Sequence, residues 1–149
     1  HNGSVWPHDT AMAAAGMARY GERRAVALLL GEIYAAAAHF HLRLPELFCG
    51  FERNPGEPPI AYPVACLPQA WAAGSVFLML QASLGLSIDA WSGTVDLIDP
   101  VLPAGLQTLK IQGLQVGNAS VDLDIQHVDG RAVVVPRRKQ GGIAIRTLR

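Results

Sequence analysis

The residue best suited to chemistry is Glu46, which lies in a proline-rich segment between residues 44 and 71. Pro45 precedes it, and Leu47 and Phe48 follow it, so we expect its carboxylate to be partly buried. Partial burial tunes a carboxylate for acid–base work. The simpler interpretation is that Glu46 is a surface acid or accepts a hydrogen bond from a backbone amide. The segment alone leaves both interpretations open.

A second group of chemically active residues stands close to the start of the sequence. Trp6, His8 and Asp9 place an aromatic ring, an imidazole and a carboxylate at the approach to an expected helix. This combination suits a polar ligand that has a flat apolar face and many hydroxyl groups, such as a sugar. The alternative is that Trp6 only anchors the start of the helix.

Composition and charge narrow the classes of function. Twelve Lys and Arg balance twelve Asp and Glu, which disfavours a nucleic-acid partner, and the longest apolar run, residues 25–30, is too short to span a bilayer. Cys49 and Cys66 could pair, but they form no disulfide framework, so we expect reduced thiols in a cytoplasmic protein. Two spaced thiols do not make a metal site, and we expect no metal and no other cofactor.

The elements that must position these residues are helices in the first part of the chain. Apolar residues at a period of 3.6 predict helices over about residues 9–20, 22–40 and 68–84. The first and third are apolar almost all round, so we expect neighbours on most sides of each. The segment between the second and third is too long for an idle connection and has its own apolar anchors, so we expect it to be ordered.

From Trp91 onward the apolar period changes from 3.6 to 2. About five strands, separated by glycine-containing turns, predict an antiparallel β meander with one buried face. We therefore expect an α+β chain in two parts, with the helices in residues 1–91 and the strands in residues 92–149.

Two blocks carry a family resemblance. The first is His1-Asn-Gly-Ser-Val-Trp-Pro-His-Asp9, and the second joins Leu44-Pro-Glu-Leu-Phe-Cys-Gly50 to Tyr62-Pro-Val-Ala-Cys-Leu-Pro-Gln-Ala-Trp71. These blocks resemble bacterial glycogen-debranching enzymes of the amylo-α-1,6-glucosidase type and their relatives among the six-hairpin (α/α)6-barrel glycosidases. The resemblance covers the helical part well and the strand-rich part less specifically.

The resemblance implies a fold and a chemistry. It implies that residues 1–91 are the last helices of an (α/α)6 toroid, followed by a small antiparallel β meander or sandwich. It implies an inverting glycoside hydrolase that acts on α-glucans, with α-1,6 branch points as the expected bond and Glu46 as the general base. The residues expected to contact the substrate are Trp6, His8, Asp9, Phe48, Tyr62, Gln69 and Trp71.

Other functions stay open under the same resemblance. The family's general acid comes from an earlier loop that this chain does not contain, so we expect the isolated chain to be inactive. A phosphorylase or glucanotransferase of the same fold is an alternative, and so is a non-catalytic carbohydrate-binding or structural fragment. The expected partners are an α-glucan or oligosaccharide and either a second copy or the rest of the barrel, with no nucleic acid and no membrane.

Overall fold

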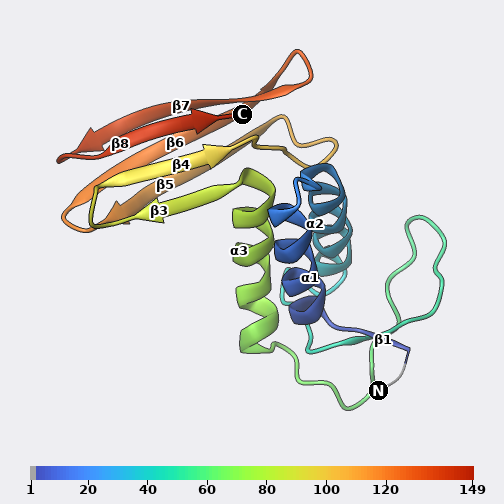
Figure 1. Ribbon diagram of the computed structural model, residues 1–149. Coiled ribbons are helices and arrows are strands. Elements are labelled where there is room, and N and C mark those ends of the chain that lie inside the picture. The colour runs from blue at the N-terminus through green and yellow to red at the C-terminus, as the bar shows by residue number, and fades with distance from the viewer. Residues whose placement is uncertain (1–2) are drawn as a thin grey trace.

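The computed structural model describes residues 3–149 of the chain. His1 and Asn2, which open the first block that resembles debranching enzymes, lie outside the described residues. Three helices stand side by side in this structure, and a layered group of strands lies at one end of them (Figure 1). The helices come first in the chain and the long strands follow.

The helices form near the positions that the apolar pattern predicts. Their bounds are α1 (Pro7–Arg19), α2 (Arg23–Ala38) and α3 (Ala70–Leu84). Helix α1 starts earlier than expected, because Pro7 occupies its first position, where a fixed φ and a missing N–H cost nothing. Helix α3 ends at Gly85, which adopts a left-handed φ of 57°.

Small side chains hold the three helices together. Helix α1 packs on both α2 and α3, and α2 packs on α3. Alanine lines most of the contact faces, which lets helix backbones approach closely. The fully or almost fully buried alanines of this core are Ala11, Ala14, Ala18, Ala36, Ala37, Ala72 and Ala82, and larger residues such as Val26, Ile33 and Met79 fill the spaces between them.

Two short strands join the chain start to the long loop. Strand β1 (Ser4–Val5) pairs antiparallel with β2 (Phe48–Cys49), so that Ser4 faces Cys49 and Val5 faces Phe48. The loop between α2 and α3 is therefore ordered, as expected, and lies against the residues that lead into α1.

The remaining strands make two sheets of three strands. One contains β3 (Leu86–Asp89), β4 (Thr94–Ile98) and β8 (Ala144–Leu148), and the other contains β5 (Thr108–Val116), β6 (Ala119–Val128) and β7 (Arg131–Gln140). The two sheets share one hydrophobic core, in which the innermost side chains are Leu84, Val95, Leu97, Val121, Leu123 and Ile125.

The expectation of the final helices of an (α/α)6 toroid is wrong. Residues 3–149 contain three helices and eight strands in three sheets, and 33% of these residues are in strands and 30% in helices. An inner helix of a toroid is enclosed by neighbours, whereas Met12 of α1 and Phe77 of α3 stay 57% and 74% exposed. Buried alanines let the helices pack on one another along one side each, and the other sides remain open.

The simple antiparallel meander is also wrong. Strand β8 pairs with β4 in parallel, and the long strands divide between two sheets. The alternating pattern shows which residues face a core, but it does not show which strands are neighbours. The division of the chain after residue 91 stays a prediction.

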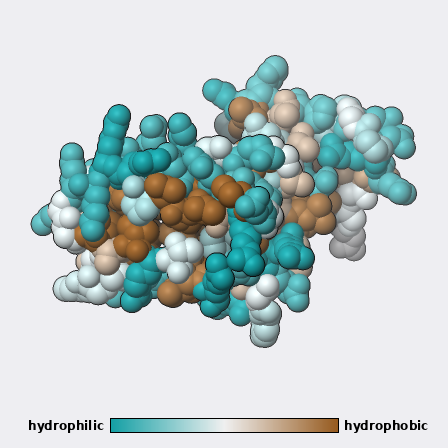
Figure 2. All heavy atoms as spheres, turned by 90° about the horizontal axis from the view of Figure 1, so that it is seen from above, coloured by the Kyte–Doolittle hydropathy of each residue, from teal (hydrophilic) through white to brown (hydrophobic). Residues whose placement is uncertain are grey.

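The surface is mixed in character. Figure 2 shows hydrophobic side chains between hydrophilic rims over the strand-bearing part of the molecule. The large hydrophobic side chains left exposed on the long strands include Val128, Val133 and Leu148. In the described part of the chain, each helix falls short of the length and apolar character that crossing a bilayer requires.

Candidate functional site

The predicted site residues gather at the end of the helices that points away from the strands. Helices α1 and α3 lie against each other and both begin at this end, where β1 and the long loop also lie (Figure 1). Trp6 caps α1, and Trp71 is the second residue of α3. We call Trp6, His8, Asp9 and Trp71 the N-terminal cluster.

Aromatic contacts organise the N-terminal cluster. The imidazole of His8 stacks on the indole of Trp71, with ring centroids 5.0 Å apart and planes inclined by 18°. The indole of Trp6 meets Trp71 edge-on, at 6.1 Å and 76°. Trp71 remains 46% exposed, so one ring of the cluster is held in place from two sides and still presents apolar surface to solvent.

Polar groups surround this ring. The carboxylate of Asp9 lies 3.2 Å from Nδ1 of His8 and is otherwise open to solvent. The hydroxyl of Thr10 donates a hydrogen bond of 2.8 Å to the Trp6 carbonyl, which fixes the first turn of α1. The first turns of α1 and α3 also direct their unpaired N–H groups and positive dipole ends toward this region. The cluster thus combines an apolar platform with a carboxylate, an imidazole and oriented backbone donors.

Glu46 is held by the far side of the same loop. Its backbone N–H donates to the Cys66 carbonyl at 2.9 Å, and its Oε2 accepts a hydrogen bond of 3.3 Å from the Cys66 N–H. Among residues 3–149, no partner bonds to the other carboxylate oxygen, Oε1. The simpler expectation, a backbone hydrogen bond to Glu46, is therefore met, while one oxygen of a half-buried carboxylate stays free to act.

A chain of contacts links Glu46 to the N-terminal cluster. Leu44, two residues before Glu46, accepts a hydrogen bond of 3.3 Å from the N–H of Gln69. Gln69 caps α3, with its own side-chain oxygen accepting from the Ala70 N–H. Trp71 follows two residues later. The structure therefore places the carboxylate, the helix cap and the aromatic platform on connected segments at one end of the helices.

Two other predicted substrate contacts have different surroundings. Phe48 is only 4% exposed and packs at 5.4 Å from the ring of Phe40, so it belongs to the helical core and leaves almost no surface for a ligand. Tyr62 is half-buried in the same long loop, next to Ala61, which bridges to Phe48. The Tyr62 carbonyl accepts a hydrogen bond of 3.1 Å from the N–H of Ala65 in the same loop.

The exposed tip of the loop has its own polar bonds. Asn54 donates to the carboxylate of Glu57 from its backbone and its side chain, at 3.2 and 3.1 Å. The side-chain bond from Asn54 is the main reason that the pKa of Glu57 lies below its usual range. Arg53 also lies 3.6 Å from Glu32 of α2. These contacts tie the tip to itself and to α2, at some distance in sequence from Glu46.

Cys49 and Cys66 are both free thiols, as expected. Within residues 3–149, no three side chains of His, Cys, Asp or Glu lie close enough together to hold a metal ion.

Comparison with known proteins leaves the motif resemblance untested. No protein-family model matches the chain, and a comparison with curated proteins finds no significant match. The likeness of the two blocks to debranching enzymes therefore stays a prediction, based on the residues that form the site.

Sequence reasoning missed part of the site. It did not foresee that Cys66 anchors Glu46 through its backbone, because a backbone group carries no signal in residue type. It also did not foresee the stacking of His8 on Trp71, since these residues are 63 positions apart. A signal was present in the matched placement of Trp6 and Trp71, each of which stands at the first turn of an apolar helix.

Proposed function

We propose that the N-terminal cluster binds an α-glucan chain and that Glu46 serves as the general base in its hydrolysis, with α-1,6 branch points as the bond attacked. The observation that carries this proposal is the Trp71 indole, which is held by His8 and Trp6 and remains 46% exposed beside a carboxylate. A flat apolar face next to hydrogen-bonding groups matches the two sides of a sugar ring. The motif resemblance supplies the substrate class.

Hydrolysis by an inverting glycosidase requires two carboxyl groups. In an inverting glycosidase one carboxylate deprotonates a water while a carboxylic acid protonates the leaving oxygen, and the two groups lie about 6.5–9.5 Å apart. Glu46 offers a free Oε1 for the water, and its bonds to Cys66 hold it in one orientation. The resemblance places the general acid in an earlier loop outside this chain. Hydrolysis of maltooligosaccharides by the isolated chain would instead require an acid within it, and Asp9 of the N-terminal cluster would then be the first candidate.

A non-catalytic carbohydrate-binding role is the second candidate. The bond from the Cys66 N–H to Glu46 favours it, because this bond gives the carboxylate a structural role that requires no catalysis. In that role the cluster would bind the same sugars through Trp71, His8 and Asp9, and no bond would be cleaved. Both candidates share the aromatic platform and differ in what Glu46 does.

The experiment that separates them compares Glu46→Gln with Glu52→Gln. Glu52 is an exposed carboxylate of the same loop for which the described residues provide no partner, so it is a matched control. Loss of a general base lowers turnover by about 10² to 10⁴-fold. Because the isolated chain is expected to be inactive, both variants are made in the full-length enzyme. There we expect such a loss in the release of reducing sugar from a branched α-glucan with Glu46→Gln, and none with Glu52→Gln.

Sugar binding provides the second readout. If Glu46 is the base, Glu46→Gln should bind maltooligosaccharides about as tightly as the unchanged protein, since the base acts in the transition state. Binding without any turnover in the unchanged protein would favour the non-catalytic role. Equal turnover in Glu46→Gln and the unchanged protein would remove Glu46 from the mechanism.

Two further proposals concern the cellular location of the protein and its self-association. We propose a cytoplasmic location, supported by the two free thiols of Cys49 and Cys66, which persist in a reducing compartment. We also propose that the chain associates with a second copy, supported by the exposed side chains of Met12 and Phe77 on neighbouring helices.

A further inference from the structure

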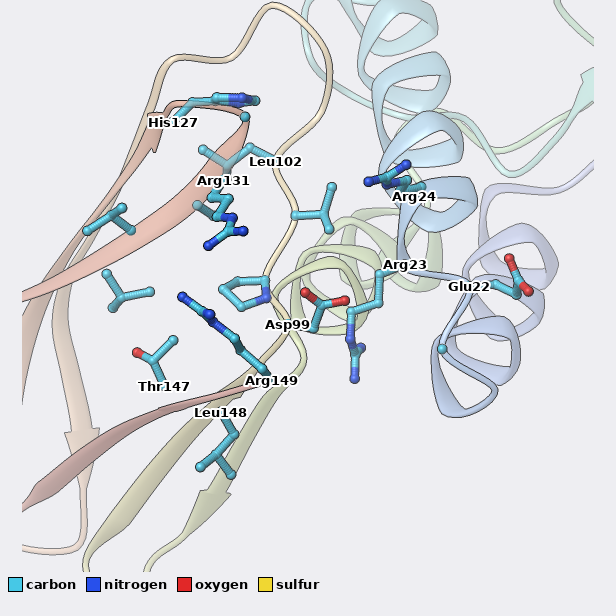
Figure 3. Close-up of a pocket in the computed structure, with 17 residues that line it drawn as sticks. Glu22, Arg23, Arg24, Asp99, Leu102, His127, Arg131, Thr147, Leu148 and Arg149 are labelled. Carbon is cyan, nitrogen blue, oxygen red and sulfur yellow. The ribbon is translucent and has the colours of Figure 1, made fainter.

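We propose that a cleft between the helices and the strands binds a phosphate group, either inorganic phosphate or the phosphate of a small phosphate monoester. The cleft lies at the start of α2, and its other walls are residues 99–102, the turn between β6 and β7, and the end of β8 (Figure 3). Its volume is about 700 Å³, which is within the range of small-molecule sites.

Positive charge is concentrated in this cleft. Four arginines line it, namely Arg23, Arg24, Arg131 and Arg149, against the two carboxylates of Glu22 and Asp99. The whole chain, by contrast, balances twelve basic and twelve acidic residues. One third of the basic side chains therefore meet in one cleft, with an excess of two positive charges that matches a phosphate dianion.

Three of these arginines are free to bind. Within residues 3–149, the side chains of Arg24, Arg131 and Arg149 make no hydrogen bond or ion pair. Figure 3 shows Arg131 and Arg149 directed into the same space from the strands, while Arg24 faces the cleft from α2. Guanidinium groups bind phosphate oxygens through paired N–H donors, so arginines from three elements can surround one phosphate.

The fourth arginine, Arg23, makes a structural hydrogen bond. It donates a hydrogen bond of 3.0 Å to the Ala82 carbonyl, in the last turn of α3. This bond fixes the start of α2 against the end of α3, where the strands begin. Arg24 therefore extends from a residue next to this fixed point.

The first turn of α2 is unfavourable without an anion. It carries Arg23 and Arg24, no acidic residue lies in this turn, and Glu22 at the cap makes no side-chain capping bond. Positive side chains oppose the positive dipole end of a helix, and its first N–H groups lack intrahelical acceptors. A bound phosphate would offset the charge of the arginines and would accept from the N–H groups of Arg24 and Ala25, because the Arg23 N–H already donates to the Gly21 carbonyl at 2.9 Å.

The cleft is separate from the proposed carbohydrate site. Helix α1 runs between them, since Trp6 caps its first turn and Gly21 at its other end lines the cleft. A helix of 13 residues is about 20 Å long. A ligand in the cleft therefore does not touch the N-terminal cluster.

The test is a titration of the ¹⁵N-labelled chain with inorganic phosphate, glucose 6-phosphate and glucose. We expect both phosphates to shift the amide signals of Arg24, Ala25 and Arg131, and glucose to leave them unchanged. Equal affinity for inorganic phosphate and glucose 6-phosphate would show that the cleft recognises the phosphate group alone. Tighter binding of glucose 6-phosphate would identify a phosphorylated small molecule. Either result supports the cleft, and neither depends on whether the N-terminal cluster binds sugar.

Variants test the arginines directly. Arg131→Gln and Arg24→Gln should each weaken phosphate binding about tenfold, as expected for one lost charge-assisted contact. Arg43→Gln is the control, because Arg43 is exposed beyond the opposite end of α2 and its side chain also has no bonding partner among residues 3–149. The proposal is overturned if neither phosphate shifts these amides, or if Arg43→Gln weakens binding as much as Arg131→Gln, which would indicate attraction by overall charge only.

Discussion

Replacing Trp71 by alanine is the most direct test of the carbohydrate platform. A tryptophan side chain contributes up to about 250 Å² of surface, and Trp71 is 46% exposed, so about 100 Å² is available to a ligand. A sugar that covers half of this area removes about 50 Å² from water. At about 25 cal/mol per Å² this stabilises the complex by about 1.3 kcal/mol, or close to tenfold in affinity.

The assay is the affinity for maltotriose, measured by calorimetry. Trp71→Ala should weaken binding about tenfold, whereas Trp71→Phe keeps an aromatic face and should lose about threefold or less. Trp91 provides a matched control, because it is a fully exposed tryptophan in the turn between β3 and β4, away from the cluster. Trp91→Ala should bind maltotriose as the unchanged protein does.

The effect of Trp71→Ala on the stability of the protein must be measured separately from its effect on binding. Trp71→Ala also removes the contacts with His8 and Trp6, so its thermal unfolding should be recorded beside the binding. A folded Trp71→Ala protein that binds maltotriose as tightly as Trp91→Ala would refute the platform. The sugar, if it binds, would then use another surface.

Three further predictions concern stability and association. Leu123→Ala, in the shared core of the sheets, should lower the free energy of unfolding by about 2–5 kcal/mol in urea titrations, while exposed Leu42→Ala should change it by less than about 0.5 kcal/mol. Arg146 bonds to both oxygens of Asp96 at 2.6 Å, and this is the main reason that the Asp96 pKa is lowered. The stabilisation is present above the ordinary Asp pKa of about 3.9 and is lost as pH falls through the lowered value, so Arg146→Gln should destabilise the protein near neutrality and have little effect in strong acid; an equal effect at both pH values would contradict this. Light scattering should show self-association that Phe77→Glu reduces, because Phe77 is exposed on α3, and a monomer at every concentration would refute the apolar contact.

Local sequence signals predicted the three helices and singled out the candidate site residues. Apolar spacing located three helices to within a few residues, because the buried side of each helix repeats at 3.6 residues whatever it packs against. Proline content identified the long loop, and residue type alone singled out Glu46 and Trp6 as candidates.

Only the tertiary structure decided what lies next to what. The family resemblance implied the toroid, and two helices that are apolar almost all round agreed with it. Hydrophobicity does not name the neighbour that covers a face, however, and here Met12 and Phe77 remain exposed. The parallel pairing of β8 with β4 and the arginine cleft join residues about 50 to more than 100 positions apart. Such contacts depend on the path of the chain in space, because backbone pairing and long-range packing leave no period in the sequence. The stacking of His8 on Trp71, on which the proposed function rests, belongs to the same class.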